Sequence, residues 1–377
     1  MIPFEIERLG VLMEPKPGDP NESGGVLNPA AARGKDGQLY LFPRVVGPGN
    51  YSRIGIVRVL FDSAGEPTGV ERLGYALEPE ADYERDPKTG RGGCEDARVT
   101  FVEVVDHYVM TYTALTASGP RIAIARSEDL ITWERVGLAK FHRYKDMDFN
   151  GVDDKDASVC PALVDDPDSE PSVAMLHRPL FRGTRPEELA NTSGPEDIEN
   201  DLQTIWISYW HWDRETMKRK SRQFVAMRRL AMPDAPWERL KIGGGPPPIE
   251  CRHGWLFLYH GVSEREGSTA EHPKLCYSAG AMILDRERPH RILYRSPEPI
   301  LIPTMPQELT GTVDGVVFPT GLDRRSDIGQ PDRYDVYFGM ADDRIGVGKL
   351  IVPETLPKQR HHRPSTHEKG ADHEARA

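Results

Sequence analysis

The chain has 377 residues, of which 38% are hydrophobic, and a formal net charge of −11 at pH 7. This apolar content supports a large folded core, and the acidic balance argues against nucleic acid as a partner, because neutralising phosphates requires a basic face. No apolar run is long enough to span a membrane, and the N-terminus lacks the basic-then-apolar pattern of a signal peptide. We therefore expect a cytoplasmic protein with no membrane partner.

A pattern of two strands recurs five times along the chain. Each copy begins with a short apolar or aromatic strand that ends in a polar or small residue, and the copies start about 65 to 80 residues apart. A second strand follows each first one, and three of the second strands are rich in Gly and Ala. The first strands cover 39–44, 108–112, 172–177, 255–260 and 335–342, and the second strands cover 54–57, 121–125, 205–208, 276–281 and 345–348.

Five such repeats predict an all-β fold, a five-bladed β-propeller formed by residues 1–356, with a pair of β-sandwiches as the alternative. The 35 glycines and 33 prolines are spread along the whole chain, as expected for many short strands joined by turns. Residues 214–232 are predicted to form a short exposed helix, and 179–203 a long acidic loop. The charged tail 357–377 is predicted to be disordered.

In a propeller, polar residues at equivalent places in successive repeats can converge in the axial funnel. The ends of the five first strands are therefore candidate site positions. They carry Arg44, Tyr112, His177 with Arg178, His260 and Asp342.

The segment 92–98 joins two glycines to an acidic pair and an arginine. Along an extended strand Glu95 and Asp96 point to opposite sides, so one can pair with Arg98 while the other faces the funnel. The alternative is a turn closed by a salt bridge.

Basic residues gather in two further segments. Lys155 stands among acids, and His177 and Arg178 follow an apolar strand. Lys, His and Arg together can bind a tetrahedral dianion, with Arg supplying a fork of donors and Lys a point charge. The four cysteines are far apart in sequence, so we expect free thiols and no metal site. The glycine-rich segment 243–248 lacks the Lys-Ser/Thr pair of a nucleotide-binding loop.

Taken together, these segments resemble glycoside hydrolase family 130, the β-mannoside phosphorylases and related mannosidases, which are five-bladed propellers. The resemblance covers about residues 20 to 352. It rests on the ordered set of motifs at 28–30, 93–98, 155–157, 175–179, 254–262 and 337–343. Two residues depart from the family pattern: Ala97 stands where proline is usual, and Cys160 where phenylalanine is common.

The resemblance implies roles for particular residues. Asp96 takes the role of the catalytic carboxylate. Lys155, His177 and Arg178 take the role of the phosphate-binding set, and Asn28, Arg44 and Asp342 that of the residues that grip the sugar in the −1 subsite. Glu95, Arg98, Tyr112 and His260 are added as substrate-binding candidates.

The resemblance implies an inverting phosphorylase that cleaves a β-mannoside with inorganic phosphate to give α-mannose 1-phosphate. The candidate substrates are manno-oligosaccharides, mannosyl-glucose and mannosyl-N-acetylglucosamine. Phosphate is already a nucleophile, so one acid suffices, whereas an inverting hydrolase also needs a base. No cofactor other than the phosphate co-substrate is expected, and family members often form homo-oligomers.

Two other functions are alternatives. A hydrolase of the same fold would need Glu95, Glu308 or Asp314 to supply the base. A propeller that only binds sugar would show no turnover.

Overall fold

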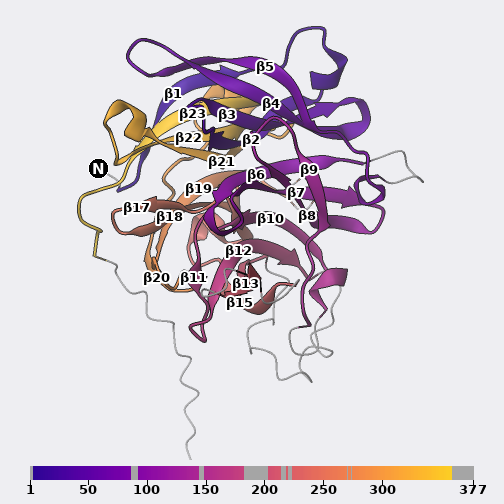
Figure 1. The fold of residues 1–377 in the computed structure, drawn as a ribbon. Helices are drawn as coiled ribbons and strands as arrows, with labels where there is room; N and C mark the ends of the chain where they lie inside the picture. Colours follow the sequence, from indigo (N-terminus) through magenta and orange to yellow (C-terminus); the bar gives the residue numbers. More distant parts are fainter. Residues whose placement is uncertain are drawn as a thin grey trace, which may run out of the picture.

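The computed structural model describes residues 3–85, 92–143, 148–181, 203–213, 218–219, 223–269, 271–272 and 274–358. These residues form five antiparallel sheets that are the blades of a propeller, so the predicted fold is confirmed (Figure 1). All ten strands predicted from the repeats are present.

The blades follow one another in chain order. Blade 1 contains β2 (Gly25–Arg33), β3 (Leu39–Gly47), β4 (Tyr51–Phe61) and β5 (Pro67–Leu77). Blade 2 contains β6 (Cys94–Val102), β7 (His107–Thr116), β8 (Gly119–Ser127) and β9 (Glu134–Leu138). Blade 3 contains β10 (Asp153–Val159), β11 (Val164–Asp165), β12 (Pro171–Leu180), β13 (Ile205–Asp213), β14 (Lys218–Arg219) and β15 (Val225–Ala231).

The last two blades complete the ring. Blade 4 contains β16 (Lys241–Gly244), β17 (Ile249–Cys251), β18 (Gly254–Glu264), β19 (Leu275–Leu284) and β20 (Ile292–Arg295). Blade 5 contains β21 (Val317–Arg324), β22 (Arg333–Met340), β23 (Arg344–Ile351) and β1 (Ile6–Met13). The N-terminal strand thus completes the last blade, and β2 lies against β21 to close the circle.

Helices are short and join the strands. The α-helix α2 spans Pro306–Leu309. Short 3₁₀ helices are η1 (Pro20–Glu22), η2 (Pro48–Asn50), η3 (Asp82–Glu84), η4 (Glu103–Val105), η5 (Phe149–Gly151), η6 (Pro236–Glu238) and η7 (Arg325–Ile328).

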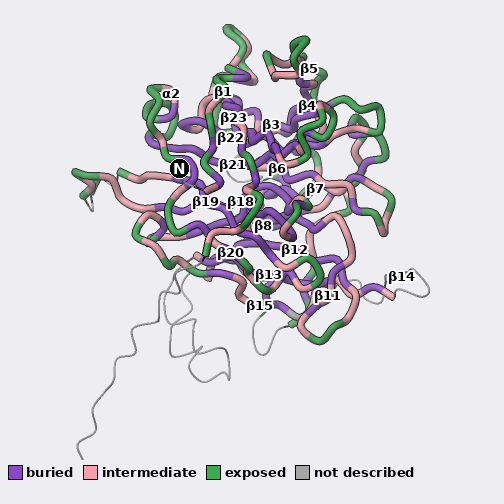
Figure 2. Tube along the Cα trace, turned by 90° about the vertical axis from the view of Figure 1, so that its left-hand side faces the viewer, coloured by how far each residue is buried: buried purple, intermediate pink, exposed green. Residues whose placement is uncertain are grey.

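One apolar cluster fills each junction between neighbouring blades. Strand β18 illustrates why, because successive side chains of a strand point to opposite faces of its sheet. Leu256 and Leu258 pack toward blade 5, whereas Phe257 and Tyr259 pack toward blade 3. Both faces of each blade are therefore buried, and exposed residues lie at the outer edges and loops (Figure 2).

The helix predicted over 214–232 is wrong for the part of that segment that the structure describes. Residues 218–219 and 225–231 are strands β14 and β15, which pair with β13. Pairing with an existing strand outweighs the weak helical tendency of this segment. Most of the predicted acidic loop 179–203 and nearly all of the predicted tail 357–377 lie outside the described residues.

Candidate active site

Three of the innermost strands carry the same irregularity near their first residues. The pairing register shifts between Leu27 and Ala30 in β2, between Glu95 and Arg98 in β6, and between Lys155 and Ser158 in β10. Inside these bulges the φ angles of Asn28, Asp96 and Asp156 are 46°, 50° and 55°. Asn and Asp tolerate this left-handed conformation better than other side chains except glycine. Each bulge therefore changes the direction of a polar side chain near the N-terminal end of its strand.

Asp96 lies in a hydrogen-bonded group with Asn28 and Arg44. The Nδ2 of Asn28 donates to Oδ1 of Asp96 at 2.9 Å, and Nη1 of Arg44 lies 3.7 Å from the same oxygen. Nη2 of Arg44 donates to Oε1 of Glu95 at 2.8 Å. One guanidinium thus contacts both carboxylates of the acidic motif.

The expectation that Glu95 and Asp96 point to opposite sides is wrong. It assumed a regular strand, and the bulge breaks the alternation between them. Within the part of the chain that the structure describes, Arg98 forms no salt bridge with Glu95 or Asp96. It is buried, and it donates to the backbone carbonyls of Gly245, Asp96 and Ala97 at 2.6, 2.9 and 3.1 Å.

Arg44 and Asp342 line one cavity of about 330 Å³, together with Asn50 and Thr312. Asp342 follows β22 and has a φ of 50°. Burial and the negative charge of Asp96 raise the pKa of Asp342 to about 6, and Arg44 opposes that rise. The sugar-binding candidates Asn28, Arg44 and Asp342 are therefore gathered beside Asp96.

A second group contains the cations. Nζ of Lys155 lies 3.7 Å from Oε2 of Glu95, which connects this group to the first. Nε of Arg178 donates to Oδ2 of Asp156 at 2.6 Å, and Arg178 also donates to Gln203. Although burial disfavours the charged carboxylate, the guanidinium groups of Arg178 and Arg98 hold the pKa of Asp156 below its usual range.

His260 is fully buried beside Asp156, with Nε2 3.8 Å from Oδ2 of that residue. Burial lowers the pKa of His260 to about 3, so its ring is neutral at physiological pH. Within the described part of the chain, neither ring nitrogen has a hydrogen-bond partner, and Nη2 of the buried Arg98 has none either. Buried polar groups of this kind are usually satisfied, so these atoms are available to a ligand or to water.

The structure does not bring Tyr112 or His177 to these groups. The hydroxyl of Tyr112 donates to Glu84 at 2.6 Å inside the junction of blades 1 and 2. His177 is fully buried, and its two ring nitrogens contact Asp154 and Ser208. The structure places Tyr112 and His177 inside the longer strands β7 and β12, where adjacent residues point to opposite faces. Only Arg178 of the His-Arg pair therefore faces Asp156.

Asp156 was not proposed as a site residue from the sequence. Its signal was a local echo, in which an Asn or Asp is followed by Pro or Ala at 28–29, 96–97 and 156–157. This repeated dipeptide indicates a site residue only when the structure shows that each copy lies in the bulge of an innermost strand.

Two of the three carboxylates suggested as a hydrolytic base are already paired with other groups, and the third is exposed. Glu308 is fully buried, and it accepts hydrogen bonds from Arg8, Thr304 and Met305 around the start of α2. Both oxygens of Glu95 face cations, Arg44 and Lys155. Asp314 is exposed and accepts from the backbone of Gly311 at 3.3 Å.

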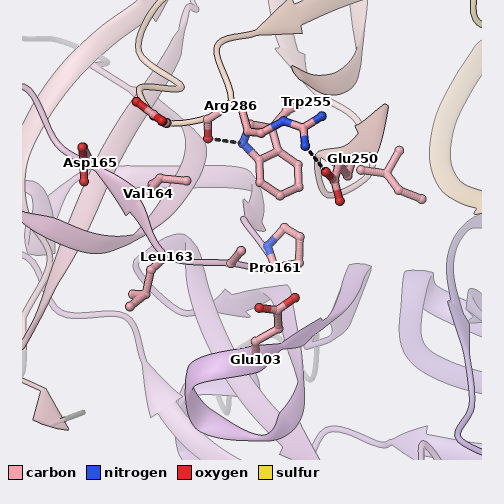
Figure 3. Close-up of a pocket in the computed structure, with 11 residues that line it drawn as sticks. Glu103, Pro161, Leu163, Val164, Asp165, Glu250, Trp255 and Arg286 are labelled. Carbon is pink, nitrogen blue, oxygen red and sulfur yellow. Dashed lines mark hydrogen bonds and ion pairs between the residues drawn. The ribbon is translucent and has the colours of Figure 1, made fainter. Parts of the chain in front are cut away.

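A larger cavity, of about 590 Å³, does not include Asp96 among its lining residues, and Figure 3 shows the residues that do line it. Glu103 and Pro161, which follow the far ends of β6 and β10, line it together with Trp255 and Arg286. None of the residues proposed from the sequence contributes to it. Among the described residues, no group of His, Cys, Asp and Glu side chains could hold a metal ion, and no helix is long and apolar enough to cross a membrane.

Comparison with known proteins gives consistent matches. A family model described as β-1,4-mannooligosaccharide phosphorylase matches residues 10–179 and 198–357. A β-1,4-mannooligosaccharide phosphorylase of Ruminococcus albus is 35% identical over 307 residues, which cover 81% of this chain and 71% of the relative. A 1,2-β-oligomannan phosphorylase of Thermoanaerobacter sp. is 27% identical over 372 residues, 93% of this chain and 99% of the relative.

The fold has a close match among solved structures. The β-1,2-mannobiose phosphorylase of Listeria innocua, in complex with β-1,2-mannobiose, superposes with a TM-score of 0.64 at 22% identity. The match covers 90% of this chain and 94% of that structure.

Proposed function

The chain belongs to the family of β-1,4-mannooligosaccharide phosphorylases, glycoside hydrolase family 130, and we propose that it cleaves a β-mannoside with inorganic phosphate and inversion of configuration to give α-mannose 1-phosphate. The family membership confirms the resemblance inferred from the motifs. It also makes the chain an enzyme of the mannoside phosphorylase class.

The observation that best supports phosphorolysis is the distribution of charge around Asp96. Lys155 and Arg178 supply cations on the neighbouring strands, and Arg98 and His260 have buried polar atoms without partners in the described chain. A tetrahedral dianion needs such donors, and a charged ligand also compensates buried cations. We assign phosphate to this second group, with His260 and Arg98 joining Lys155 and Arg178.

Asp96 supplies the proton in the proposed reaction. Its proton passes to the glycosidic oxygen, directly or through the 3-hydroxyl of the mannosyl residue, as the bond from that oxygen to C1 breaks. A phosphate oxygen forms the new bond to C1 from the opposite face of the ring, which converts the β-mannoside into α-mannose 1-phosphate. Asp96 then regains a proton from solvent. Asn28 and Arg44 orient its carboxyl group, and Asp342 binds the sugar in the adjoining cavity.

Hydrolysis has less support at this site. An inverting hydrolase needs a second carboxylate that can activate water on the far side of the ring. Glu95 is held between Arg44 and Lys155, and Glu308 is fully hydrogen-bonded away from Asp96. The phosphate co-substrate is the only cofactor we propose.

Linkage, location and assembly are further parts of the proposal. The similar enzymes are named for β-1,4 and for β-1,2 linkages, so both belong in a substrate panel with mannosyl-glucose and mannosyl-N-acetylglucosamine. A sugar phosphate is charged and does not cross membranes freely, which favours a cytoplasmic enzyme. A homo-oligomer is expected, and light scattering of the full chain measures it.

The deciding experiment incubates the full chain with each disaccharide, with and without phosphate, and measures mannose 1-phosphate and free mannose. Phosphate-dependent formation of mannose 1-phosphate is the expected result. Free mannose in the absence of phosphate would establish the hydrolase, and binding without either product would establish a sugar-binding propeller.

A further inference from the structure

We propose that Asp154, His177 and Ser208 form a buried triad that positions the phosphate-binding cations, and that His177 is a positioning residue rather than a phosphate ligand. The inference rests on the proposed function, because its measured effect is on phosphate. It revises the role that the sequence motif suggested for His177.

The triad crosses three neighbouring strands of blade 3, β10, β12 and β13 (Figure 1). Nδ1 of His177 lies 2.6 Å from Oδ2 of Asp154, and Nε2 lies 2.8 Å from Oγ of Ser208. His177 and Ser208 are fully buried, and Asp154 is 2% exposed. The ring of His177 also stacks on Phe141, with centroids 5.2 Å apart.

The hydrogen bonds leave no ring nitrogen for a ligand. A carboxylate accepts hydrogen bonds but does not donate them, so Nδ1 of His177 carries a proton toward Asp154. Nε2 is engaged by the hydroxyl of Ser208, which can donate or accept and therefore satisfies this nitrogen in either tautomer. Phosphate could reach His177 only after one of these contacts breaks.

Each triad residue on β10 and β12 is the chain neighbour of a proposed phosphate-binding cation. Lys155 follows Asp154, Arg178 follows His177, and Lys155 and Arg178 are direct partners in the β10–β12 register. Alternation along the strands turns His177 toward the junction with blade 2, where Phe141 packs on its ring, and turns the two cations to the opposite face.

The triad also lies next to the bulge that determines the direction of the Asp156 side chain. The register of β10 and β12 is interrupted between Lys155 and Ser158, and Asp156 binds Arg178 from within this interval. A slip of two residues would keep apolar side chains on the same face, whereas a row of directional hydrogen bonds matches only one register. The triad thus couples the bulge to the position of Arg178.

The test measures Michaelis constants for phosphate and sugar in Ser208→Ala, with Ser208→Thr as the conservative variant that keeps the hydroxyl. Ser208→Ala should raise the phosphate constant by about 10- to 100-fold and change the sugar constant far less, since small displacements of a positioning group have effects of this size. Ser208→Thr should recover part of the loss. If His177 were a ligand, Ser208→Ala would free Nε2, and the phosphate constant would stay the same or fall.

A double variant and a matched control complete the design. His177→Asn keeps a donor for Asp154 but loses the contact with Ser208, so combining it with Ser208→Ala should add little to either single effect. The control is His211→Phe, which removes another His–Asp contact of blade 3, 3.0 Å from His211 Nε2 to Asp166 Oδ2. His211→Phe should lower the melting temperature and leave the phosphate constant unchanged.

The outcomes separate the two levels of the proposal. If the unmodified chain forms no mannose 1-phosphate and inorganic phosphate does not raise its melting temperature, the proposed function fails. If the unmodified chain is active but Ser208→Ala lowers only the melting temperature, as the control does, the positioning role is overturned. An unchanged phosphate constant in a correctly folded His177→Asn protein would overturn it as well.

Discussion

At the scale of single residues, the site separates an acid from a set of cations. Asp96 is held by Asn28 and Arg44, whereas Arg178 is held by Asp156. The two groups meet at Glu95, which contacts both Arg44 and Lys155. A sugar beside Asp96 and a phosphate beside Arg178 would thus be held by adjoining groups of the same site.

Asp96→Asn should fold normally and lower turnover by about 10²-fold or more, the scale of a lost general acid. The amide keeps the contact with Asn28 or Arg44 but has no proton to deliver. Steady-state kinetics measures the loss, and Asp314→Asn is the control for an exposed aspartate. Activity near that of the unmodified chain would remove Asp96 from its role.

Arg178→Ala should raise the Michaelis constant for phosphate much more than that for sugar. A charge-assisted, forked contact is worth about 1.5–3 kcal/mol, or roughly 10- to 150-fold in affinity. Arg178→Lys should restore only part of it, since a point charge cannot reproduce the fork. Equal increases in both constants, with a lower melting temperature, would instead indicate that Arg178 mainly neutralises Asp156.

Asp342 should make the ligand-free protein less stable as pH rises from about 4 to 6. Burial and Asp96 raise the pKa of its carboxyl group to about 6, so folding favours the protonated form. The stabilising contribution is complete below the ordinary pKa and is lost as pH rises through the raised one. Asp342→Asn should therefore raise the melting temperature more at pH 7 than at pH 4, while weakening sugar binding. If the melting temperatures of the two proteins changed with pH in the same way across this range, Asp342 would not have the raised pKa.

At the scale of elements, the site depends on bulges in the innermost strands and on a glycine that faces one of them. A Cβ on Gly243 of β16 would lie 2.3 Å from Oδ2 of Asp156 and 2.4 Å from Cε1 of His260. Strand β16 can approach the bulge of β10 only because this position has no side chain.

Gly243→Ala should therefore displace Asp156 or His260 and reduce phosphate-dependent turnover by about 10-fold or more, as expected for a shift near 1 Å. Gly69→Ala is the matched control, because nothing lies within 4 Å of its added carbon and its φ is not in the left-handed region. Kinetics and a thermal melt should both distinguish the two variants. Equal behaviour would show that the bulge tolerates the added methyl group.

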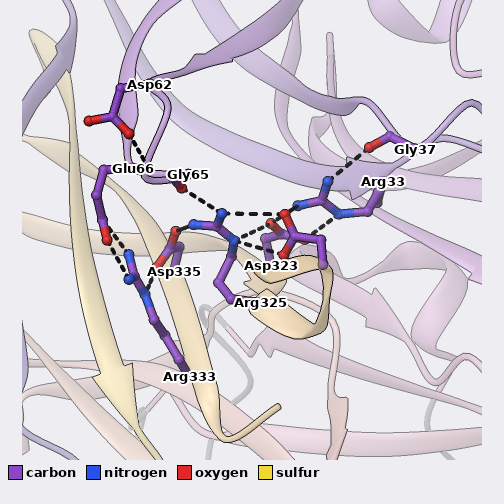
Figure 4. Close-up of polar contacts among 10 residues, drawn as sticks. Arg33, Gly37, Asp62, Gly65, Glu66, Asp323, Arg325, Arg333 and Asp335 are labelled. Atoms are coloured by element: carbon purple, nitrogen blue, oxygen red, sulfur yellow. Dashed lines mark hydrogen bonds and ion pairs between the residues drawn. The ribbon is translucent and has the colours of Figure 1, made fainter. Parts of the chain in front are cut away.

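At the scale of the whole molecule, a charged network reinforces the junction between the first and last blades. Arg325 binds Asp335 and donates to the carbonyl of Gly65 at 2.6 Å (Figure 4). Arg333 donates to Asp335 at 2.8 Å and to Glu66 at 2.6 and 2.5 Å. The network thus connects the turn between β4 and β5 to blade 5, in which the first strand, β1, pairs with the last, β23.

Arg325→Met should destabilise the fold by about 3 kcal/mol, the lower end of the cost of breaking a buried ion pair, because the buried Asp335 then keeps only Arg333 as a cationic partner. Arg325 is fully buried, and so is Asp335. Chemical denaturation measures the loss, and both Michaelis constants should stay the same. Arg58→Met is the control, since it removes an exposed pair with Glu71 whose worth is about 0–1 kcal/mol. A similar loss in both variants would show that the network does not secure the junction.

The sequence was sufficient to predict the blades, because each blade repeats a local pattern of apolar strands. Period-two alternation needs only neighbouring residues, and all ten predicted strands were found at their predicted places. The motifs also led to the family, since their residues stand in a fixed order along the chain. The weak helical signal at 214–232 was misleading because pairing with β13 decides the conformation there.

The tertiary structure decided which face each candidate side chain occupies. Bulges are not visible in a pattern of alternation, so the joint contact of Glu95 and Asp96 with Arg44 could not be predicted. His177 and Arg178 are both polar and adjacent in sequence, yet His177 contacts Ser208 on one face of the sheet and Arg178 contacts Asp156 on the other. Which of two adjacent residues reaches a site depends on strand register and on partners distant in sequence, and only the closed ring of blades sets these.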